Sequence, residues 1–263
     1  MWAATRPAAI LPEFIQIAAG SSSPFIGSPH DVSAPSFNSP SQTRLYLMLA
    51  AGEGAEARLR SALSAAPFDA VMISPPAGSQ RATAPLEALV ALAQSNNAAA
   101  LIAGDPALAR ATRADGVHLS WSDDLEDRYD AARKSLGPRE IVGVDASGSR
   151  HVAMTLAEAG ADYIAFTKSE PAAEDETAID GQHVLVQWWA EVFEVPCVAL
   201  GVRTAEQATA LASSGADYVG IEAEAGLSLE AMASRARAVA AAVGVTDPEG
   251  NTGAGLSSSR GER

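Results

Sequence analysis

The sequence predicts a single (β/α)₈ barrel between residues 43 and 243, on three observations. Eight short β-rich runs alternate with eight helical patterns over this stretch. The runs are apolar almost throughout, as expected of parallel strands covered on both faces. A related turn, "RAD" at 113–115 and "GAD" at 160–162 and 215–217, precedes three of them. An open doubly wound sheet is the alternative, but it seldom needs so many units.

Each expected strand is rich in aliphatic, β-branched or aromatic residues and is bounded by turn residues. The repeated turn is interpreted as a helix C-cap followed by the entry into the next strand. Its aspartates then lie at the N-terminal ends of the strands, which is the face of a barrel that serves stability. The expected strands are 45–49, 70–74, 99–104, 116–120, 141–146, 163–167, 197–201 and 218–223.

The expected helices carry start and stop signals. Pro106 stands in the first turn of the third helix, and Gly137 closes the fourth. Thr204, three residues before Gln207, predicts a capping box at the start of the seventh. The expected helical segments are 53–66, 84–96, 106–113, 123–137, 149–160, 183–193, 204–215 and 228–244.

Composition divides the chain of 263 residues into three parts. Residues 1–42 are rich in Ser, Pro and Ala without a sustained period, and residues 244–263 are similar in character. Such segments bury too little apolar surface to offset the entropy of ordering them. We therefore expect a disordered N-terminal extension (1–42), one barrel domain (43–243) and a disordered tail (244–263).

Charge and hydropathy exclude several classes of function. A net charge of −14 argues against nucleic acid or an anionic membrane surface as the main partner. No apolar run reaches the roughly 18 residues of a membrane span, and prolines at 7 and 12 interrupt the start, where a signal peptide would lie. These features predict a cytoplasmic protein with a small-molecule ligand, and they leave a homo-oligomer open. The single cysteine, Cys197, excludes an internal disulfide and is expected to be a small buried side chain.

Five segments together carry a resemblance to a known family. They are "ADGVHL" (114–119), "IVGV" (141–144), "EAGADYIAF" (158–166), "VPCVALG" (195–201) and "SSGADYVGI" (213–221). In this order and spacing the chain resembles thiamine-phosphate synthase and its relative thiazole tautomerase (the TenI-like family), over roughly residues 44–243. The resemblance implies a (β/α)₈ barrel of thiamine biosynthesis. The synthase joins a pyrimidine diphosphate to a thiazole phosphate and releases pyrophosphate with the help of Mg²⁺.

The chain departs from the family pattern where the third and fourth strands end. The family's Asn-Asp after the third strand, whose Asp serves the metal, corresponds to Ala103 and Gly104, and Asp105 stands one residue out of register. The family's His-Leu-Gly-Gln-x-Asp corresponds to "HLSWSD" at 118–123. His118 and Asp123 are therefore kept, and the resemblance makes Asp123 the remaining carboxylate of metal-binding type.

Further departures follow at the ends of the fifth to eighth strands. A serine two residues before a histidine, a Gly-Pro pair, a Gly-Gly pair and a phosphate-binding serine are all altered. A pyrophosphate-holding lysine expected after the sixth strand has no match in "AAEDET" at 172–177. The corresponding residues are Asp145 and Ser147, Thr167 and Lys168, Gly201 and Val202, and Ala223 between Glu222 and Glu224.

These departures favour a diverged member of the family with lost or altered synthase activity, which binds or converts a small ligand at the C-terminal mouth of the barrel. Two carboxylates beside the expected phosphate site would repel a dianion. A genuine synthase with an altered site and a non-catalytic binding or regulatory barrel are the alternatives. Whether the protein is an enzyme is left open, and Mg²⁺ is expected only if synthase activity is retained.

The candidate site collects polar residues that follow the strands, because such side chains converge at the mouth of a barrel. Only two of the 18 basic residues are lysines, and one of them, Lys168, follows the sixth strand. A lysine among carboxylates can bind an anion or act as a base. The catalytic candidates are Lys168 and Asp145. The substrate-binding candidates are His118, Asp123, Gly201, Arg203 and Glu222, and Asp123 is also the candidate metal ligand.

Overall fold

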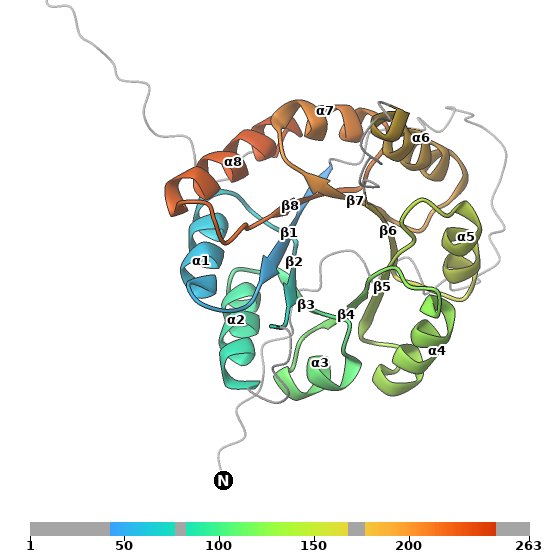
Figure 1. Ribbon diagram of the computed structural model, residues 1–263, viewed down its shortest axis with the longest axis horizontal. Coiled ribbons are helices and arrows are strands. Elements are labelled where there is room, and N and C mark those ends of the chain that lie inside the picture. Colours follow the sequence, from blue (N-terminus) through green and yellow to red (C-terminus); the bar gives the residue numbers. More distant parts are fainter. Residues whose placement is uncertain (1–42, 77–82, 168–176, 246–263) are drawn as a thin grey trace, which may run out of the picture.

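The computed structural model describes residues 43–76, 83–167 and 177–245. Its eight strands are all parallel and close into a barrel in chain order, with β8 paired to β1. Figure 1 shows the ring of strands with the helices arranged around it. The prediction of a (β/α)₈ barrel is confirmed, and the open-sheet alternative is wrong.

Strands and helices alternate without interruption along the described part of the chain. The strands are β1 (Arg44–Ala50), β2 (Ala70–Ser74), β3 (Ala99–Ala103), β4 (Gly116–Leu119), β5 (Ile141–Asp145), β6 (Tyr163–Thr167), β7 (Cys197–Val202) and β8 (Tyr218–Glu222). The helices are α1 (Ala55–Ala65), α2 (Thr83–Ser95), α3 (Pro106–Thr112), α4 (Leu125–Leu136), α5 (Arg150–Glu158), α6 (Thr177–Val192), α7 (Ala205–Ser213) and α8 (Leu229–Ala242).

The helix signals of the sequence correspond to real caps. Pro106 stands at the start of α3, and Thr204 and Gln207 form the expected capping box of α7. One boundary differs clearly from the sequence analysis, since α6 begins at Thr177 rather than near 183. The segment before 183 (TAIDGQ, 177–182) has Ile179 as its single large apolar residue and contains Gly181, so no apolar period marks it as a helix.

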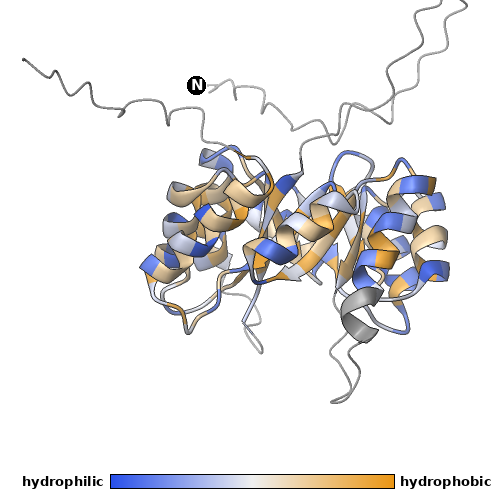
Figure 2. Ribbon diagram, turned by 90° about the horizontal axis from the view of Figure 1, so that it is seen from above, coloured by the Kyte–Doolittle hydropathy of each residue, from blue (hydrophilic) through white to orange (hydrophobic). Residues whose placement is uncertain are grey.

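Two hydrophobic layers form the core. One lies between the strands and the helices and holds most of the buried aliphatic residues, together with Trp189 and Cys197. The other fills the barrel interior and includes Tyr46, Tyr163 and Tyr218. Figure 2 shows hydrophobic residues mainly along the strands and hydrophilic residues mainly on the surrounding helices. The barrel interior is therefore a packed core. In this fold the ligand and active sites lie at the C-terminal ends of the strands.

Gly143 shows how tightly the interior is filled. A Cβ built on this β5 residue would lie 1.9 Å from the ring of Tyr163. Only glycine leaves room for that ring on the inner side of the barrel. Gly143 and Tyr163 are also partners in the β5–β6 register, so the tyrosine crosses directly over its neighbour.

The repeated turn has the structural role that the sequence predicts. Gly160 and Gly215 both have φ of +94°, and Arg113 takes the equivalent left-handed conformation with φ of +58°. The aspartate that ends each copy accepts a hydrogen bond from a backbone N–H near the start of the preceding strand. The pairs are Asp115 with Ala100, Asp162 with Val142, and Asp217 with Cys197. These carboxylates fix adjacent strands at the N-terminal face.

The expected disordered segments, 1–42 and nearly all of 244–263, lie outside the described residues. The described structure extends past the expected boundary at 243, because Gly244 and Val245 follow α8. Within the described ranges no helix combines the length and hydrophobicity needed to cross a membrane. Cys197 is fully buried and unpaired, as expected.

Candidate functional site

The C-terminal ends of the strands form the mouth of the barrel. Alternation along a strand decides which side chains face its interior. Tyr163 faces inward, so Thr167, four residues later on β6, lies on the same side. Asp145 follows Gly143 by two residues and therefore also faces inward, above the packed interior. By the same alternation Glu222, four residues after the interior residue Tyr218, stands at the rim.

Among the described residues, Asp145 is held by hydrogen bonds from Ser147 and Thr167. Its Oδ1 accepts the N–H of Ser147 at 2.8 Å, and its Oδ2 accepts the hydroxyl of Thr167 at 2.5 Å. The Ser147 bond closes a turn in which Ser147 itself has φ of +51°. Burial raises the pKa of the Asp145 carboxyl, although these hydrogen bonds partly oppose the shift. Asp145 is 8% exposed and lies at the top of the interior.

A chain of buried polar groups lies within the barrel interior. Nδ1 of His118 is 2.8 Å from the hydroxyl of Tyr163, which is 3.0 Å from the hydroxyl of Tyr46. His118 is 1% exposed, and burial lowers its pKa to about 4. Burial raises the pKa of both tyrosines, and the charge of Asp145 adds to the shift. His118 is therefore neutral near pH 7 and hydrogen-bonded within the interior.

The ends of β7 and β8 form a corner that combines opposite charges. Glu222 and Arg203 are exposed there. Glu224 is paired with Arg235 of α8 at 2.7 Å. The hydrogen bond from Arg235 lowers the pKa of Glu224, and the charge of Arg203 contributes further, which places Arg203 near this pair. Gly201 at the end of β7 has φ of +79° and open space at its Cβ position.

This arrangement changes the electrostatic expectation for the corner. The sequence suggested two carboxylates that repel a phosphate. In the structure the corner also holds two arginines, Arg235 paired with Glu224 and the exposed Arg203, so the four side chains carry no net charge. The corner therefore does not repel an anion as a bare carboxylate pair would.

The backbone at the same corner is largely occupied. The N–H of Ala223 donates to Met48 O at 2.8 Å. The N–H groups of Arg203 and Thr204 both donate to Oε1 of Gln207. Recognition of an anion here would therefore depend on the Arg203 side chain more than on these three backbone donors.

The carboxylates after β3 and β4 lie in the turns before their helices, and one of them caps a helix. Asp105 caps α3, because its side chain accepts the N–H of Leu108 at 2.9 Å. Asp123 lies exposed in the turn before α4, and the neighbouring Trp121 is 44% exposed. Arg128 donates to Ser122 Oγ at 2.7 Å within this loop.

A Mg²⁺ site does not emerge from the described residues. Nowhere in these ranges do three His, Cys, Asp or Glu side chains gather as metal ligands. Asp123 alone supplies one exposed carboxylate, and Mg²⁺ usually takes one or two carboxylates together with substrate phosphates. The donor set of the described residues therefore does not form a resident metal site.

The structure brings Asp145 and His118 to the barrel interior and Gly201, Arg203 and Glu222 to the β7–β8 corner. Asp123 belongs to the separate β4–α4 turn. Lys168, the other catalytic candidate, lies outside the described residues. The proposed grouping of Lys168 with Asp145 stays a prediction.

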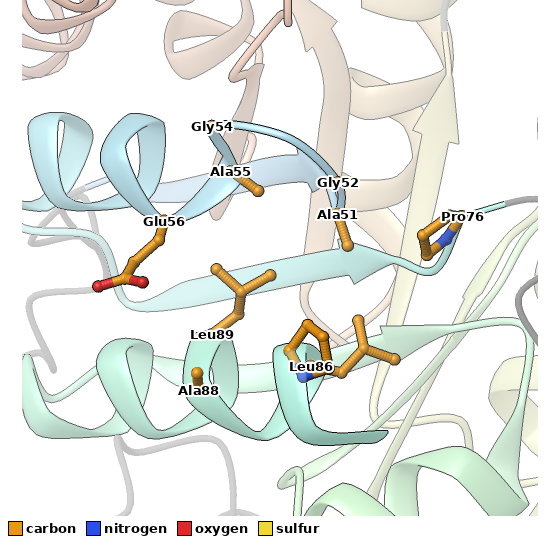
Figure 3. Close-up of a pocket in the computed structure, with 10 residues that line it drawn as sticks. Ala51, Gly52, Gly54, Ala55, Glu56, Pro76, Leu86, Ala88 and Leu89 are labelled. Carbon is orange, nitrogen blue, oxygen red and sulfur yellow. The ribbon is translucent and has the colours of Figure 1, made fainter. Parts of the chain in front are cut away.

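A pocket of about 540 Å³ lies at the same end of the barrel, between the β1–α1 turn and α2. Leu86 and Leu89 of α2 line it opposite Ala51, with Pro76 at one end and Glu56 at the other (Figure 3). Its lining is mostly apolar, with Glu56 as the charged residue. None of the residues singled out in the sequence analysis lines it.

The sequence did not point to Tyr46 and Tyr163 in the barrel interior or to Arg235 at the mouth, and it marked Thr167 only as a departure from the family pattern. The tyrosines read as ordinary strand residues, and their inward direction follows only from the register. Gly143 opposite Tyr163 is the one signal that could have suggested a large interior side chain. Arg235 lies in α8, eleven residues from Glu224, so nothing local in the sequence points to their pairing.

The closed barrel, with polar groups at its strand ends, defines a (β/α)₈ protein, a class in which ligand sites lie at the C-terminal ends of the strands. The sequence model of the family described as thiamine monophosphate synthase matches residues 48–223. The chain belongs to this family.

Similar proteins carry consistent names. Thiamine-phosphate synthases of Rhodospirillum centenum and Hyphomonas neptunium are 38% and 40% identical to this chain over 136 and 134 residues. These matches cover 52% and 51% of this chain and 64% and 59% of the relatives, so the chain spans a little under two thirds of their length.

Solved structures show the same fold at low identity. Thiamine phosphate pyrophosphorylase from Pyrococcus furiosus has a TM-score of 0.60 at 20% identity, and the match covers 79% of this chain and 98% of that one. Tryptophan synthase of Mycobacterium tuberculosis also reaches 0.60 at 16% identity, with 78% and 93% covered. At these identities the likeness establishes the fold alone.

Proposed function

We propose that this protein is a synthase of the thiamine-phosphate type with an altered site. In this role it joins a pyrimidine diphosphate to a thiazole phosphate at the mouth of the barrel and releases pyrophosphate. The family match and the names of the relatives favour this activity over the lost-activity hypothesis that the sequence motifs suggested.

The observation that carries the proposal is the balanced charge at the β7–β8 corner. Phosphate sites in barrels commonly lie after strands seven and eight. The pairing of Glu224 with Arg235 neutralises one carboxylate at that position, and the exposed Arg203, whose charge also acts on Glu224, supplies a cation at the same corner. Gly201 leaves open space beside them. A phosphate monoester of the substrate can therefore be held by Arg203 at this corner.

Loss of synthase activity is the second candidate, and the altered donor set favours it. Asp145 puts a buried carboxylate where the family pattern has a serine, and the N–H of Ala223 is bonded to Met48. Both changes weaken binding of a diphosphate. In this case the barrel would bind a different small ligand without forming thiamine phosphate.

A direct assay separates the two candidates. The full chain is incubated with the pyrimidine diphosphate, the thiazole phosphate and Mg²⁺, and thiamine phosphate is measured by mass spectrometry. The proposed function predicts turnover on the order of 1 s⁻¹, the lower range of ordinary enzymes. Absence of product under conditions in which a synthase from a relative is active would support the second candidate and reject the first.

A further inference from the structure

We infer that Gln182 of α6 is a positioning residue for the phosphate site: its side-chain amide holds the end of β7 in a bulged form that directs Arg203 to the mouth. The inference deepens the proposed function and rests on it, because Arg203 is the group proposed to hold the substrate phosphate. In this role Gln182 acts through Arg203 and does not itself contact the phosphate.

The first observation is an irregularity in the pairing of β7 with β8. Ala199 is the partner of Val219. The next pair toward the mouth joins Val202 to Ile221. Over this stretch β7 therefore holds one residue more than β8, which is a β-bulge. Gly201 lies within the bulge and has φ of +79°, a left-handed conformation that glycine adopts without strain.

The second observation is the direction of the last side chains of β7. Val198 and Leu200 face the barrel interior, so regular alternation would turn Val202 inward as well. Val202 instead lies in the layer beneath the helices and is 2% exposed. The extra residue has therefore reversed the alternation, which one step further directs Arg203 to the mouth side. The charge of Arg203 acts on Glu224 at the same corner, in agreement with this direction.

The third observation is the hydrogen bonding at the bulge. Helix α6 packs against β6 and β7 (Figure 1). Nε2 of Gln182 donates to the carbonyl oxygen of Leu200 at 2.9 Å and to that of Phe166, on β6, at 2.7 Å. An amide nitrogen of this kind carries two hydrogens, so one side chain can bond to both strands. Leu200 follows Ala199 at the start of the bulge, so the amide joins β6 to β7 at that point.

The surroundings of these two hydrogen bonds make them effective. Gln182 is 9% exposed, and the two acceptors belong to strand residues that are fully or almost fully buried. Water competes little for hydrogen bonds in such a place, and a missing donor is not easily replaced. Loss of the amide should therefore loosen the bulge and let Arg203 leave the position in which it can hold a phosphate.

Binding of thiazole phosphate tests the inference without relying on turnover. Its dissociation constant is measured by calorimetry for the full chain and for Gln182→Met, which keeps the side-chain length and removes both donors. We expect binding about tenfold weaker in the variant, because the phosphate ligand is misplaced. Gln94→Met is the matched control, since Gln94 also donates two hydrogen bonds through Nε2, but at the N-terminal face of the barrel. It should change the dissociation constant by less than about twofold.

A double-mutant cycle separates positioning from general stability. In the Arg203→Ala background, Gln182→Met should change the dissociation constant by less than about twofold, because the group that it positions is gone. Equal weakening in both backgrounds, or unchanged affinity in folded Gln182→Met, overturns the inference. Gln182→Asn replaces the first variant if a thermal melt shows that Gln182→Met does not fold. It keeps the amide but is one methylene shorter and cannot span both carbonyls, so the same outcomes apply.

The synthase assay distinguishes the two proposals. Affinity that depends on Gln182 through Arg203, in a chain that forms no thiamine phosphate, rejects the proposed function alone. Active synthesis by a chain in which the two substitutions act additively rejects the role of Gln182 alone. A chain that neither binds thiazole phosphate nor forms product rejects both.

Discussion

Oδ2 of Asp162 lies 2.7 Å from the backbone nitrogen of Val142, which joins the start of β6 to the start of β5. The same oxygen accepts a hydrogen bond from Arg133 of α4 at 2.6 Å. One carboxylate of the repeated turn thus fastens two strands and a helix at the face opposite the mouth.

Asp162→Ala should lower the free energy of unfolding by about 1–3 kcal/mol, because it leaves the N–H of Val142 without its side-chain acceptor and removes the carboxylate paired with Arg133. Urea unfolding measures the loss. Glu56→Ala is the control, since it breaks an exposed ion pair with Arg60 and should cost about 0.5 kcal/mol or less. Equal losses in the two variants would contradict the role given to the turn.

Gly143→Ala should prevent the barrel from packing, because its Cβ would lie 1.9 Å from the Tyr163 ring. Relief requires movement of a buried aromatic side chain, so we expect a loss of about 3 kcal/mol or more, or failure to fold. Gly201→Ala is a matched comparison: its Cβ meets open space, and only the φ of +79° is unfavourable, at a cost of about 1 kcal/mol. Thermal melts of both variants check the order, which a tolerated Gly143→Ala would reverse.

His118 should titrate with a pKa of about 4 in the folded chain, well below the ordinary value of 6.5. Between these two values the unfolded chain binds more protons than the folded one. The free energy of unfolding is therefore undiminished above pH 6.5 and falls as the pH is lowered toward 4. The loss at pH 4 is on the order of 3 kcal/mol. NMR titration of the imidazole measures the pKa directly. A His118→Asn variant with the same stability loss over this range would show that another group is responsible.

Asp145 should give the opposite pH dependence. Burial raises its pKa in the folded chain above the ordinary 3.8, so the folded chain binds more protons in the window above that value. Its contribution to stability is therefore present at acid pH and is lost as the pH rises through the folded pKa. Asp145→Asn should gain stability relative to the unmodified chain across this window. Urea unfolding at several pH values tests the sign, and a relative loss would contradict it.

The barrel was predictable because its signals are local and repeated. Apolar runs fix the strands, and caps such as Thr204 and Gln207 fix helix ends. Gly160 and Gly215 mark turns that need a left-handed residue. Each signal lies within a few residues of the feature it specifies. The start of α6 was missed because its first turn carries no apolar period.

The candidate site was less predictable because its properties depend on pairing across the fold. Following the strand ends pointed to Asp145 and Arg203, which the structure places at the ends of β5 and β7, while their roles stay predictions. The net charge at the β7–β8 corner could not be predicted from the sequence, because it depends on Arg235 of α8 pairing with Glu224. The burial of Asp145 against Thr167 likewise joins residues 22 apart in sequence.

The most direct test of the proposed synthase is the kcat/KM for thiamine phosphate formation in the full chain, compared with Arg203→Ala and Arg237→Ala. Arg237 is the control because its ion pair with Glu230 is exposed and distant in sequence from the strand ends. We predict turnover in the unmodified chain, a loss of about tenfold or more in Arg203→Ala through the KM for thiazole phosphate, and little change in Arg237→Ala. No thiamine phosphate from the unmodified chain, or equal kcat/KM in all three proteins, would contradict the account.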